Sequence, residues 1–211
     1  MSRVGRVYLP IFPLPDLTFF PHTLLPLHVF EARYRAMIGD CLGRDRRLAV
    51  VGLTPGYESG YHGKPAVHPV AGAGEIIQSE RLATGRYNIL VRGDCRIRIE
   101  GELPTDTLYR MVRAVPLADV GAERPGVPSL VAAVKRLCRQ LLKAVNRSTP
   151  QMEQALASEG PPGVLADQLA AALVPSPPVR QRLLEEPDVE VRLTLLQLTL
   201  DALLKRLNEE R

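Results

Sequence analysis

The chain has 211 residues, of which 45% are hydrophobic and 24% are charged, with no tryptophan. This is the composition of a globular protein with room for one large or two small domains. Its length excludes a chain that holds an ATPase motor, a protease domain and a recognition domain together. The 27 Lys and Arg exceed the 23 Asp and Glu by four and are mostly interspersed with them. Nucleic-acid-binding proteins usually gather cations on one face, so the charge speaks against that class.

The cysteines and the apolar runs indicate where the protein resides. Cys41, Cys95 and Cys138 lie far apart and form no C-x-x-C pair, which is typical of a reducing cytosol. The first ten residues lack the apolar core of a secretion signal, and no run of 18 apolar residues predicts a membrane span. We therefore expect a cytoplasmic protein with no membrane partner.

Up to about residue 125 the chain consists of short β-like segments punctuated by Gly and Pro. An apolar spacing of three and four over residues 30–41 predicts a helix that ends at Gly43. Strands are predicted at residues 48–53, 75–82, 91–100 and 108–115. The third strand alternates with a period of two, which places Arg96 and Arg98 on a solvated face. Residues 54–69 are predicted to form a long loop, and loops of that length are usually functional or mobile.

After residue 125 the apolar spacing becomes helical, and the junction is placed at Glu123–Ser129. Helices are predicted at residues 130–145, 150–157, 164–173, 179–184 and from residue 189 onward. Asp188 stands where its carboxylate would cap the last of these helices. The fold class is therefore α+β, with a β-rich domain over residues 1–125 and a helical bundle over residues 126–211.

The sequence carries no motif of an enzyme, a metal site or a cofactor site. Gly63-Lys64 is followed by Pro65, which breaks a phosphate loop, and Gly72-Ala73-Gly74 enters a strand instead of the helix of a dinucleotide turn. There is no G-x-S-x-G elbow and no H-E-x-x-H pair. The four histidines, at positions 22, 28, 62 and 68, lack metal-ligand spacing. We predict no catalytic residue, no cofactor and no metal.

The strongest local signal is a proline-rich apolar segment, LPIFPLPDLTFFPHTLLPLHVFEARYRAMIGDCL, at residues 9–42. Because proline has no N–H, such a segment is confined to edge strands, turns or extended covers. Most of its apolar side chains are expected to fill one end of the β-rich core. Phe19, Phe20 and His22 fall in a predicted turn, where exposed side chains beside a sheet edge would form a peptide-binding patch. Tyr57 and Tyr61 of the long loop are candidates for the same patch.

This segment resembles the start of the substrate-binding N-terminal domain of Lon proteases, in which L-P-[LI]-F-P-L-P leads through F-P to L-P-L-x-[IV]-F-E-x-R-Y-R-x-M. The matching residues are Leu9–Pro15, Phe20–Pro21, Leu25–Leu27, Phe30–Glu31, Arg33–Arg35 and Met37. Further similarity is found at Ala73–Ile76, Gly85–Ile89, Gly93–Arg98, Leu165–Asp167, Arg180–Glu185 and Val189–Leu196. The similarity is weaker at residues 54–69 and 104–128.

The resemblance implies a PUA-like β-barrel followed by a helical bundle, in a stand-alone bacterial protein of protein quality control without the AAA+ ATPase and Ser-Lys protease domains. It implies a non-enzymatic module that binds unfolded or degron-bearing polypeptides through apolar contacts, as an adaptor or a holdase. The alternative is an RNA-binding PUA-like protein, which rests on fold analogy and which the dispersed charge argues against. Cooperation with a separate protease and assembly into a homo-oligomer are left open.

Overall fold

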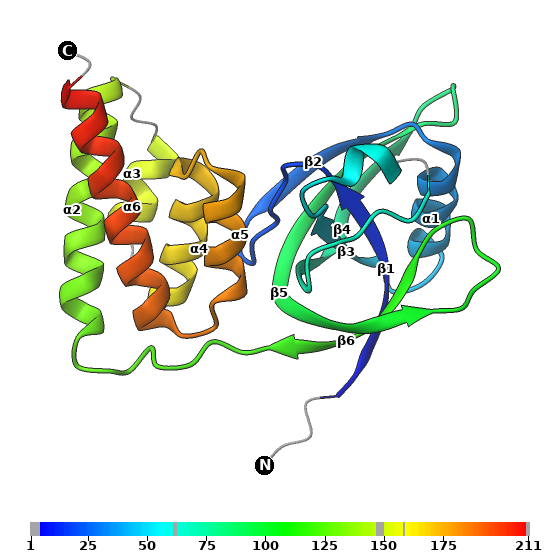
Figure 1. Ribbon diagram of the computed structural model, residues 1–211. Coiled ribbons are helices and arrows are strands. Elements are labelled where there is room, and N and C mark those ends of the chain that lie inside the picture. Colours follow the sequence, from blue (N-terminus) through cyan, green and yellow to red (C-terminus); the bar gives the residue numbers. More distant parts are fainter. Residues whose placement is uncertain (1–4, 61–62, 147–149, 158, 210–211) are drawn as a thin grey trace. The chain divides into compact units, whose positions relative to one another are not determined.

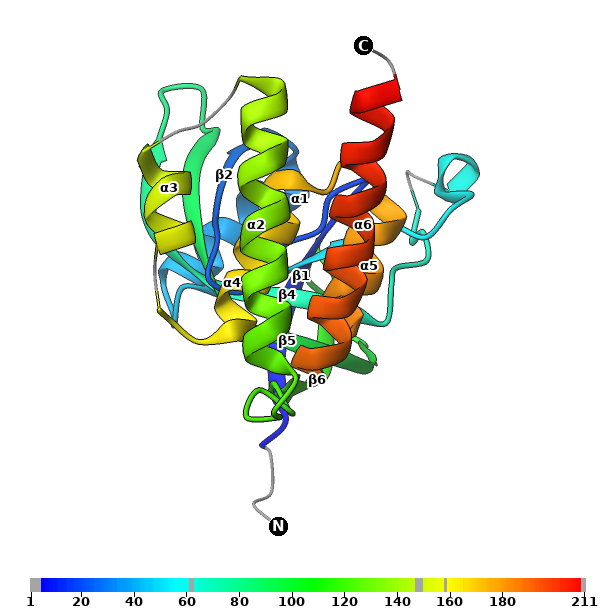
Figure 2. The ribbon, with the colours of Figure 1, turned by 90° about the vertical axis from the view of Figure 1, so that its left-hand side faces the viewer.

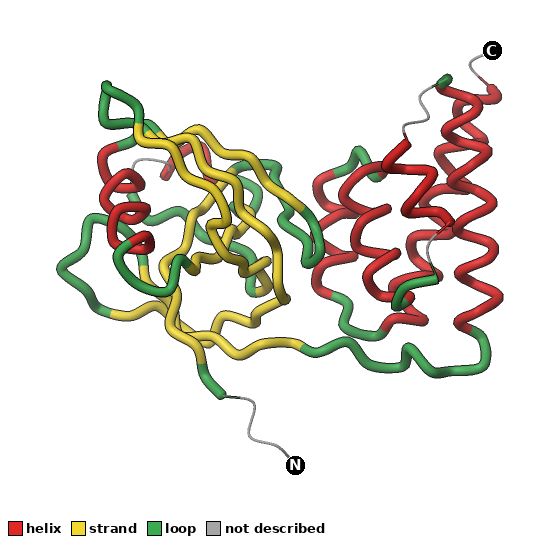
Figure 3. The backbone as a smooth tube through the Cα atoms, turned by 180° about the vertical axis from the view of Figure 1, so that it is seen from behind, coloured by secondary structure: helices red, strands yellow, loops and turns green. Residues whose placement is uncertain are grey.

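The computed structural model describes residues 5–60, 63–146, 150–157 and 159–209. The chain divides into two compact units, Met1–Ala118 and Asp119–Arg211. Over the described residues the first unit contains a mixed sheet and the second consists of helices, which Figure 3 shows in yellow and red. The division between the units falls before the junction expected at Glu123–Ser129.

The strands of the first unit form a six-stranded sheet over the described residues, with the order β2-β5-β4-β3-β1-β6 (Figure 1). The strands are β1 (Val7–Leu14), β2 (Leu24–Val29), β3 (Arg47–Gly52), β4 (Val70–Arg81), β5 (Tyr87–Leu103) and β6 (Met111–Leu117). β5 also pairs with β6, so the pairings that run from β5 through β4, β3, β1 and β6 return to β5. β2 pairs with the first part of β5 and ends the strand order.

β1 holds two prolines because it changes neighbours halfway along its length. Val7–Pro10 pairs with β6 in the antiparallel sense, and Ile11–Leu14 pairs with β3 in the parallel sense. A backbone N–H points to one side of a strand only. Pro10 and Pro13 each have one partner strand, so a nitrogen without a hydrogen is tolerated on the side that is not paired. The prolines were expected to confine this segment to edge strands, turns or extended covers. β1 lies between β3 and β6 in the strand order, but each half of it pairs on one side, as an edge strand does.

The predicted strands all overlap observed ones, and the differences have physical causes. β4 starts at Val70, earlier than predicted. The prediction missed its first part because that part is rich in Gly and Ala and shows no apolar alternation. β5 runs for 17 residues and contains the predicted strand at residues 91–100. The long loop lies where it was expected, between β3 and β4, with a short 3-10 helix η1 (Tyr57–Gly60). Its ends are joined by the bridge between Leu53 and Val67.

Two apolar clusters fill the first unit. One gathers buried side chains from β1, β3, β4, β5 and the single α-helix described in this unit, α1 (Ala32–Leu42). The residues of α1 in this cluster are Tyr34, Met37, Ile38 and Cys41. They lie on the face that the sequence periodicity predicts, except that the predicted face began at Phe30, which precedes the helix and is exposed. Leu14, Leu17, Leu25, Leu27 and Val29 also pack in or against it, as expected, whereas Ile11 belongs to the second cluster.

The described helices of the second unit are α2 (Val127–Val145), α3 (Pro150–Ala157), α4 (Pro162–Leu173), α5 (Pro177–Glu185) and α6 (Val189–Glu209). α2 and α6 lie side by side, as Figure 2 shows. Asp188 caps α6 as predicted, because its Oδ1 accepts hydrogen bonds from the backbone N–H groups of Glu190 at 3.1 Å and Val191 at 3.3 Å. No helix among the described residues combines the length and the apolar character needed to cross a membrane.

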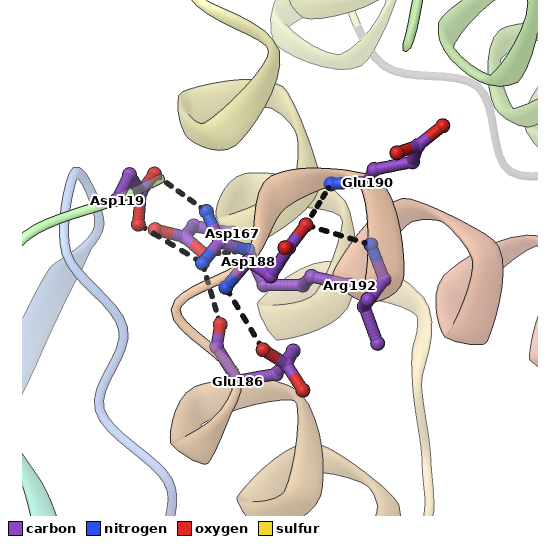
Figure 4. A network of polar contacts seen from close by, with 7 residues as sticks. Asp119, Asp167, Glu186, Asp188, Glu190 and Arg192 are labelled. Atoms are coloured by element: carbon purple, nitrogen blue, oxygen red, sulfur yellow. Dashed lines mark hydrogen bonds and ion pairs between the residues drawn. The ribbon is translucent and has the colours of Figure 1, made fainter. Parts of the chain in front are cut away.

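A buried ion-pair network ties the start of the second unit to α6 (Figure 4). The guanidinium of Arg192 is fully buried and donates to both carboxylate oxygens of Asp119, at 3.0 and 2.6 Å. It also donates to the backbone carbonyl of Glu186 at 2.8 Å, and its Nε lies 3.4 Å from the buried carboxylate of Asp167 on α4. Because these bonds hold Asp119 against α4 and α6, the helical unit begins at Asp119.

Candidate functional site

The residues between β1 and β2, Pro15–Thr23, lie across the sheet on two glycines. A Cβ atom at Gly72 would overlap the backbone carbonyl of Phe19, and one at Gly93 would overlap that of Phe20. His22 donates its backbone N–H to the carbonyl of Gly93 at 3.0 Å, and Gly93 donates to the carbonyl of Thr23 at 2.9 Å. The segment therefore approaches the sheet more closely than any residue with a side chain at these two positions would allow.

This close approach buries the two phenylalanines that were expected to be exposed. The exposed fraction is 2% for Phe19 and 0% for Phe20, and Phe19 belongs to the core cluster around α1. The prediction of an exposed aromatic pair is therefore wrong. The turn that was predicted here exists at both ends of the segment, where Asp16 and His22 have positive φ angles of 51° and 60°. Between these turns the chain is held flat against the sheet, and its rings point into the core.

His22 is the predicted residue of this segment that remains exposed. It lines a shallow depression of about 440 Å³ together with Thr23, Leu24, Arg92, Gly93 and Asp94. The charged groups in this depression already have partners, because Arg92 pairs with Glu75 at 2.9 Å and Asp94 with Arg47 at 2.8 Å. The apolar side chain here is Leu24, which is 59% exposed at the start of β2.

One side of the β2 backbone pairs with β5, and the other side forms an edge of the sheet. Its register pairs Leu24 with Arg92 and Val29 with Tyr87, and Gly93 donates to the carbonyl of Thr23 just before the strand. Because hydrogen-bonded and non-hydrogen-bonded pairs alternate in an antiparallel ladder, the backbone groups of residues 24, 26 and 28 face outward. Pro26 lacks an N–H, so the edge offers the N–H groups of residues 24 and 28 and the carbonyls of all three.

An exposed aromatic ring stands directly after β2. Phe30 is 60% exposed, and its ring stacks on that of His28 with the centroids 6.4 Å apart. His28 Nδ1 lies 2.8 Å from Asn88 Oδ1, so Nδ1 carries the proton and donates. The rings of His28 and Phe30 and the side chain of Leu24 thus form an apolar rim along the edge of the sheet, which we call the β2 rim.

The β2 rim was not predicted, although the sequence of β2 holds a signal for it. In LLPLHV the residues Leu25, Leu27 and Val29 share one parity and turn inward, while Leu24, Pro26 and His28 are exposed. That alternation is typical of a strand with one buried face. The two other predicted site residues do not belong to the rim. Tyr57 is half-buried in η1, between β3 and β4, and Tyr61 lies outside the described residues.

One of the two arginines expected on a solvated face of β5 is buried. The pairing shifts between Ala73 with Cys95 and Gly74 with Gly93, which leaves Asp94 as the extra residue of a bulge. Beyond the bulge Arg96 lies opposite Gly72, on the face that Pro15–Thr23 covers, and it is buried, whereas Arg98 stays exposed. The simple alternation fails here because a bulge reverses the face to which each later side chain points.

The thiols do not form a reactive site. Burial raises the pKa of Cys41 to about 12 and that of Cys138 to about 11, and it also raises the pKa of Cys95. Since the thiolate is the nucleophile, burial disfavours the reactive form of all three thiols. Among the described residues no three His, Cys, Asp or Glu side chains lie close enough together to hold a metal ion.

Comparison with known protein families assigns the chain. The model of the ATP-dependent protease La (LON) substrate-binding domain matches residues 8–202. The chain belongs to this family. The resemblance seen in the sequence is thereby confirmed for nearly the whole chain, including the helical unit. Membership of this family supports a role in substrate recognition. The family model that matches describes a substrate-binding domain and not a protease or an ATPase domain.

Individual Lon proteases are similar to the chain over most of its length. A Lon protease of Xanthomonas oryzae pv. oryzae is 28% identical over 191 residues, which cover 89% of this chain and 22% of that protein. Lon protease 2 of Myxococcus xanthus is 27% identical over 189 residues, which cover 89% of this chain and 23% of that protein. The chain thus spans less than a quarter of the length of these relatives.

Solved structures of Lon N-terminal domains share the fold. The N-terminal domain of a Lon protease of the Mycobacterium avium complex has a TM-score of 0.75 at 19% identity and covers 92% of this chain and 98% of that domain. A Lon N-terminal domain protein from Xanthomonas campestris has a TM-score of 0.62 at 24% identity and covers 90% of this chain and 96% of that one. At these identities the likeness establishes the fold.

Proposed function

We propose that this LON substrate-binding domain is a non-enzymatic polypeptide-recognition module that holds exposed apolar segments of unfolded or degron-bearing proteins on the β2 rim. The observation that carries the proposal is the sheet edge at β2, where outward backbone groups lie between the exposed side chains of Leu24 and Phe30. The first unit then corresponds to a PUA-like β-barrel, which the return of the strand pairings to β5 supports. The protein acts in the cytoplasm as an adaptor or a holdase beside a separate protease.

The backbone of β2 supports this role because it can accept an additional strand. An extended peptide that pairs with β2 would receive hydrogen bonds from the N–H groups of residues 24 and 28 and donate to the outward carbonyls. Such strand addition draws affinity from the main chain and is therefore tolerant of client sequence. Pro26 interrupts the row of donors, which limits pairing of the edge with a second copy of itself.

The side chains of the β2 rim add the preference for apolar clients. Leu24 and Phe30 stand at the two ends of the strand and expose most of their apolar surface. Burying an exposed leucine or phenylalanine contributes about 1.5–3 kcal/mol. The nearby charges are already paired within the protein, so they offer little to an acidic or nucleic-acid ligand. The rim therefore favours an apolar polypeptide over RNA.

The test is fluorescence anisotropy with a labelled extended peptide rich in Val and Leu. We expect Leu24→Ala combined with Phe30→Ala to weaken binding about tenfold or more, since each truncation removes apolar contact. Leu198→Ala removes an equally exposed leucine from α6 and is the matched control, with no expected effect. A peptide with the same side chains and N-methyl groups at alternate residues should also bind weakly, because it cannot form a full ladder with β2.

Two outcomes contradict the proposal. If the rim variant and the control bind the apolar peptide equally well, the site lies elsewhere. If a single-stranded RNA binds instead, with an affinity that falls steeply between low and moderate salt, the protein belongs to the RNA-binding alternative. A separate measurement of light scattering by a heat-unfolded client distinguishes a holdase from an adaptor, because a holdase suppresses aggregation of the client without a protease present.

A further inference from the structure

A second cavity of the first unit is lined by none of the residues of the β2 rim. It has a volume of about 300 Å³ and is formed by the first turn of α1, the loop before β4, the end of β5 and the β5–β6 loop. Figures 1 and 3 show the β5–β6 loop beside α1. We call this cavity the α1 cleft. Its volume is at the lower limit for ligand pockets, so it can hold the end of a chain but not a folded element.

The charge of the α1 cleft is positive. The cationic side chains that line it belong to Arg33, Lys64 and Arg110, and the acidic one belongs to Glu102. Arg33 is held in place by Glu31 at 2.9 Å and by the ring of Tyr34, whose centroid lies 4.6 Å from the guanidinium carbon. After these pairs are counted, a surplus of about one positive charge remains. That surplus matches one carboxylate better than a phosphate backbone, which needs a stripe of cations.

The guanidinium of Arg110 is fixed where it can donate further hydrogen bonds. One terminal nitrogen donates to the carbonyl of Pro65 at 2.8 Å, and the other pairs with Glu102. Each of these nitrogens carries a second N–H, because a guanidinium has five. A planar donor set that is held in place by the protein suits a carboxylate, which accepts two parallel hydrogen bonds.

The hydroxyls in the α1 cleft are arranged to accept. Thr107 Oγ1 donates its proton to the carbonyl of Tyr109 at 2.7 Å. In the 2.9 Å contact between the two hydroxyls, Thr105 must therefore be the donor, since a hydroxyl has one proton. Both protons are used inside the loop, so Thr105 Oγ1 offers lone pairs. Such an acceptor fits the backbone N–H of the residue that carries a free carboxylate.

We infer that the α1 cleft binds the C-terminal end of a polypeptide, with its α-carboxylate at Arg33, Lys64 and Arg110 and the last apolar side chain against Leu103 and Leu108. Leu108 is 69% exposed and is the most exposed large apolar side chain in the described part of the chain, so a ligand side chain can cover it. The inference rests on the proposed function only in that the client is a polypeptide. It adds recognition of the chain terminus to recognition of the chain interior.

The experiment compares two forms of one short fluorescein-labelled peptide ending in Val-Leu, a free acid and a C-terminal amide. The free acid should bind about tenfold tighter than the amide, as expected for a charge-assisted hydrogen bond. Lys64→Gln together with Arg33→Gln should bring the ratio close to one. Arg98→Gln removes an exposed cation of β5 that does not line the α1 cleft and should leave the ratio unchanged.

The outcomes separate this inference from the proposed function. Equal binding of acid and amide by the unmodified protein overturns the inference and leaves the β2 rim standing. A preference for the acid that persists in the Leu24→Ala, Phe30→Ala variant supports the α1 cleft independently of the rim. Binding of neither form overturns both. Displacement of the free acid by inorganic phosphate at equal concentration would also overturn the inference, because the cleft would then select charge and not a chain terminus.

Discussion

Replacing Arg192 with methionine is expected to destabilise the helical unit by about 3–5 kcal/mol. Methionine keeps most of the side-chain volume but removes the guanidinium that pairs with Asp119 and Asp167. The carboxylate of Asp167 is fully buried and would lose its nearby cation. Removing one partner of a buried ion pair costs this much because an uncompensated charge stays in a medium of low polarity.

The exposed pair around Arg124 provides the matched control. Arg124 also contacts two carboxylates, Asp188 at 2.8 Å and Glu190 at 3.2 Å, but its side chain is 46% exposed. Solvent screens such a pair, so Arg124→Met should destabilise the protein far less than Arg192→Met. A double variant, Arg192→Met with Asp167→Leu, removes the buried charge together with its partner. Its stability should return to within about 1–2 kcal/mol of the original protein.

Urea unfolding followed by circular dichroism measures these changes, and the helical signal reports mainly on the second unit. With slopes of about 1–3 kcal/mol per M for small proteins, a loss of 3 kcal/mol shifts the midpoint by about 1 M or more. Equal losses of stability in Arg192→Met and Arg124→Met would show that burial of the ion pair does not matter. A double variant less stable than Arg192→Met alone would show that the buried carboxylate is not the source of the loss.

Three further predictions concern the first unit. Gly72→Ala should lower the free energy of unfolding in urea by about 3 kcal/mol or more, because the new methyl group meets the Phe19 carbonyl. Gly101→Ala has open space around its Cβ and should change stability little. Equal effects of the two substitutions would contradict the close approach of Phe19 to the sheet. Phe19→Ala should cost about 3–5 kcal/mol, whereas the exposed Phe30→Ala should leave stability nearly unchanged, and a reversed order would overturn the burial assignment. Burial and a hydrogen bond to the carboxylate of Asp40 raise the pKa of Tyr109 to about 12. The free energy of unfolding should therefore fall as the pH rises from about 10 to 12. Tyr109→Phe should reduce that fall.

The sequence was most informative where one periodicity covered a whole element. The helices of the second unit and most of the inward face of α1 were predicted from apolar spacing, and the cap at Asp188 was predicted from the capping chemistry of its carboxylate. The resemblance to LON substrate-binding domains came from a segment whose prolines and aromatic residues have fixed spacing. Its interpretation as an exposed aromatic patch failed, although the segment itself was correctly recognised.

The failures share a cause, which is that burial of a side chain depends on what another segment places over it. Phe19 and Phe20 are buried because glycines at positions 72 and 93 let a distant segment lie flat on the sheet. Arg96 is buried because a bulge at Asp94 changes the face of β5. Neither the close approach nor the bulge leaves a periodic signal in the segment that it affects. The α1 cleft is formed by segments that are far apart in the sequence, from Pro13 of β1 to the β5–β6 loop, and could not be found from any one of them.

The change of neighbour in β1 has a consequence for biosynthesis. Its first half pairs with β6, and the pair of Val7 with Ala114 joins positions 107 residues apart in the chain. A nascent chain therefore carries this proline-rich stretch without its final neighbour until β6 has left the ribosome, and such distant pairings form slowly. Until β6 is made, the first half of β1 lacks its partner strand, so the nascent chain exposes unpaired strand backbone for as long as the following hundred residues take to be synthesised.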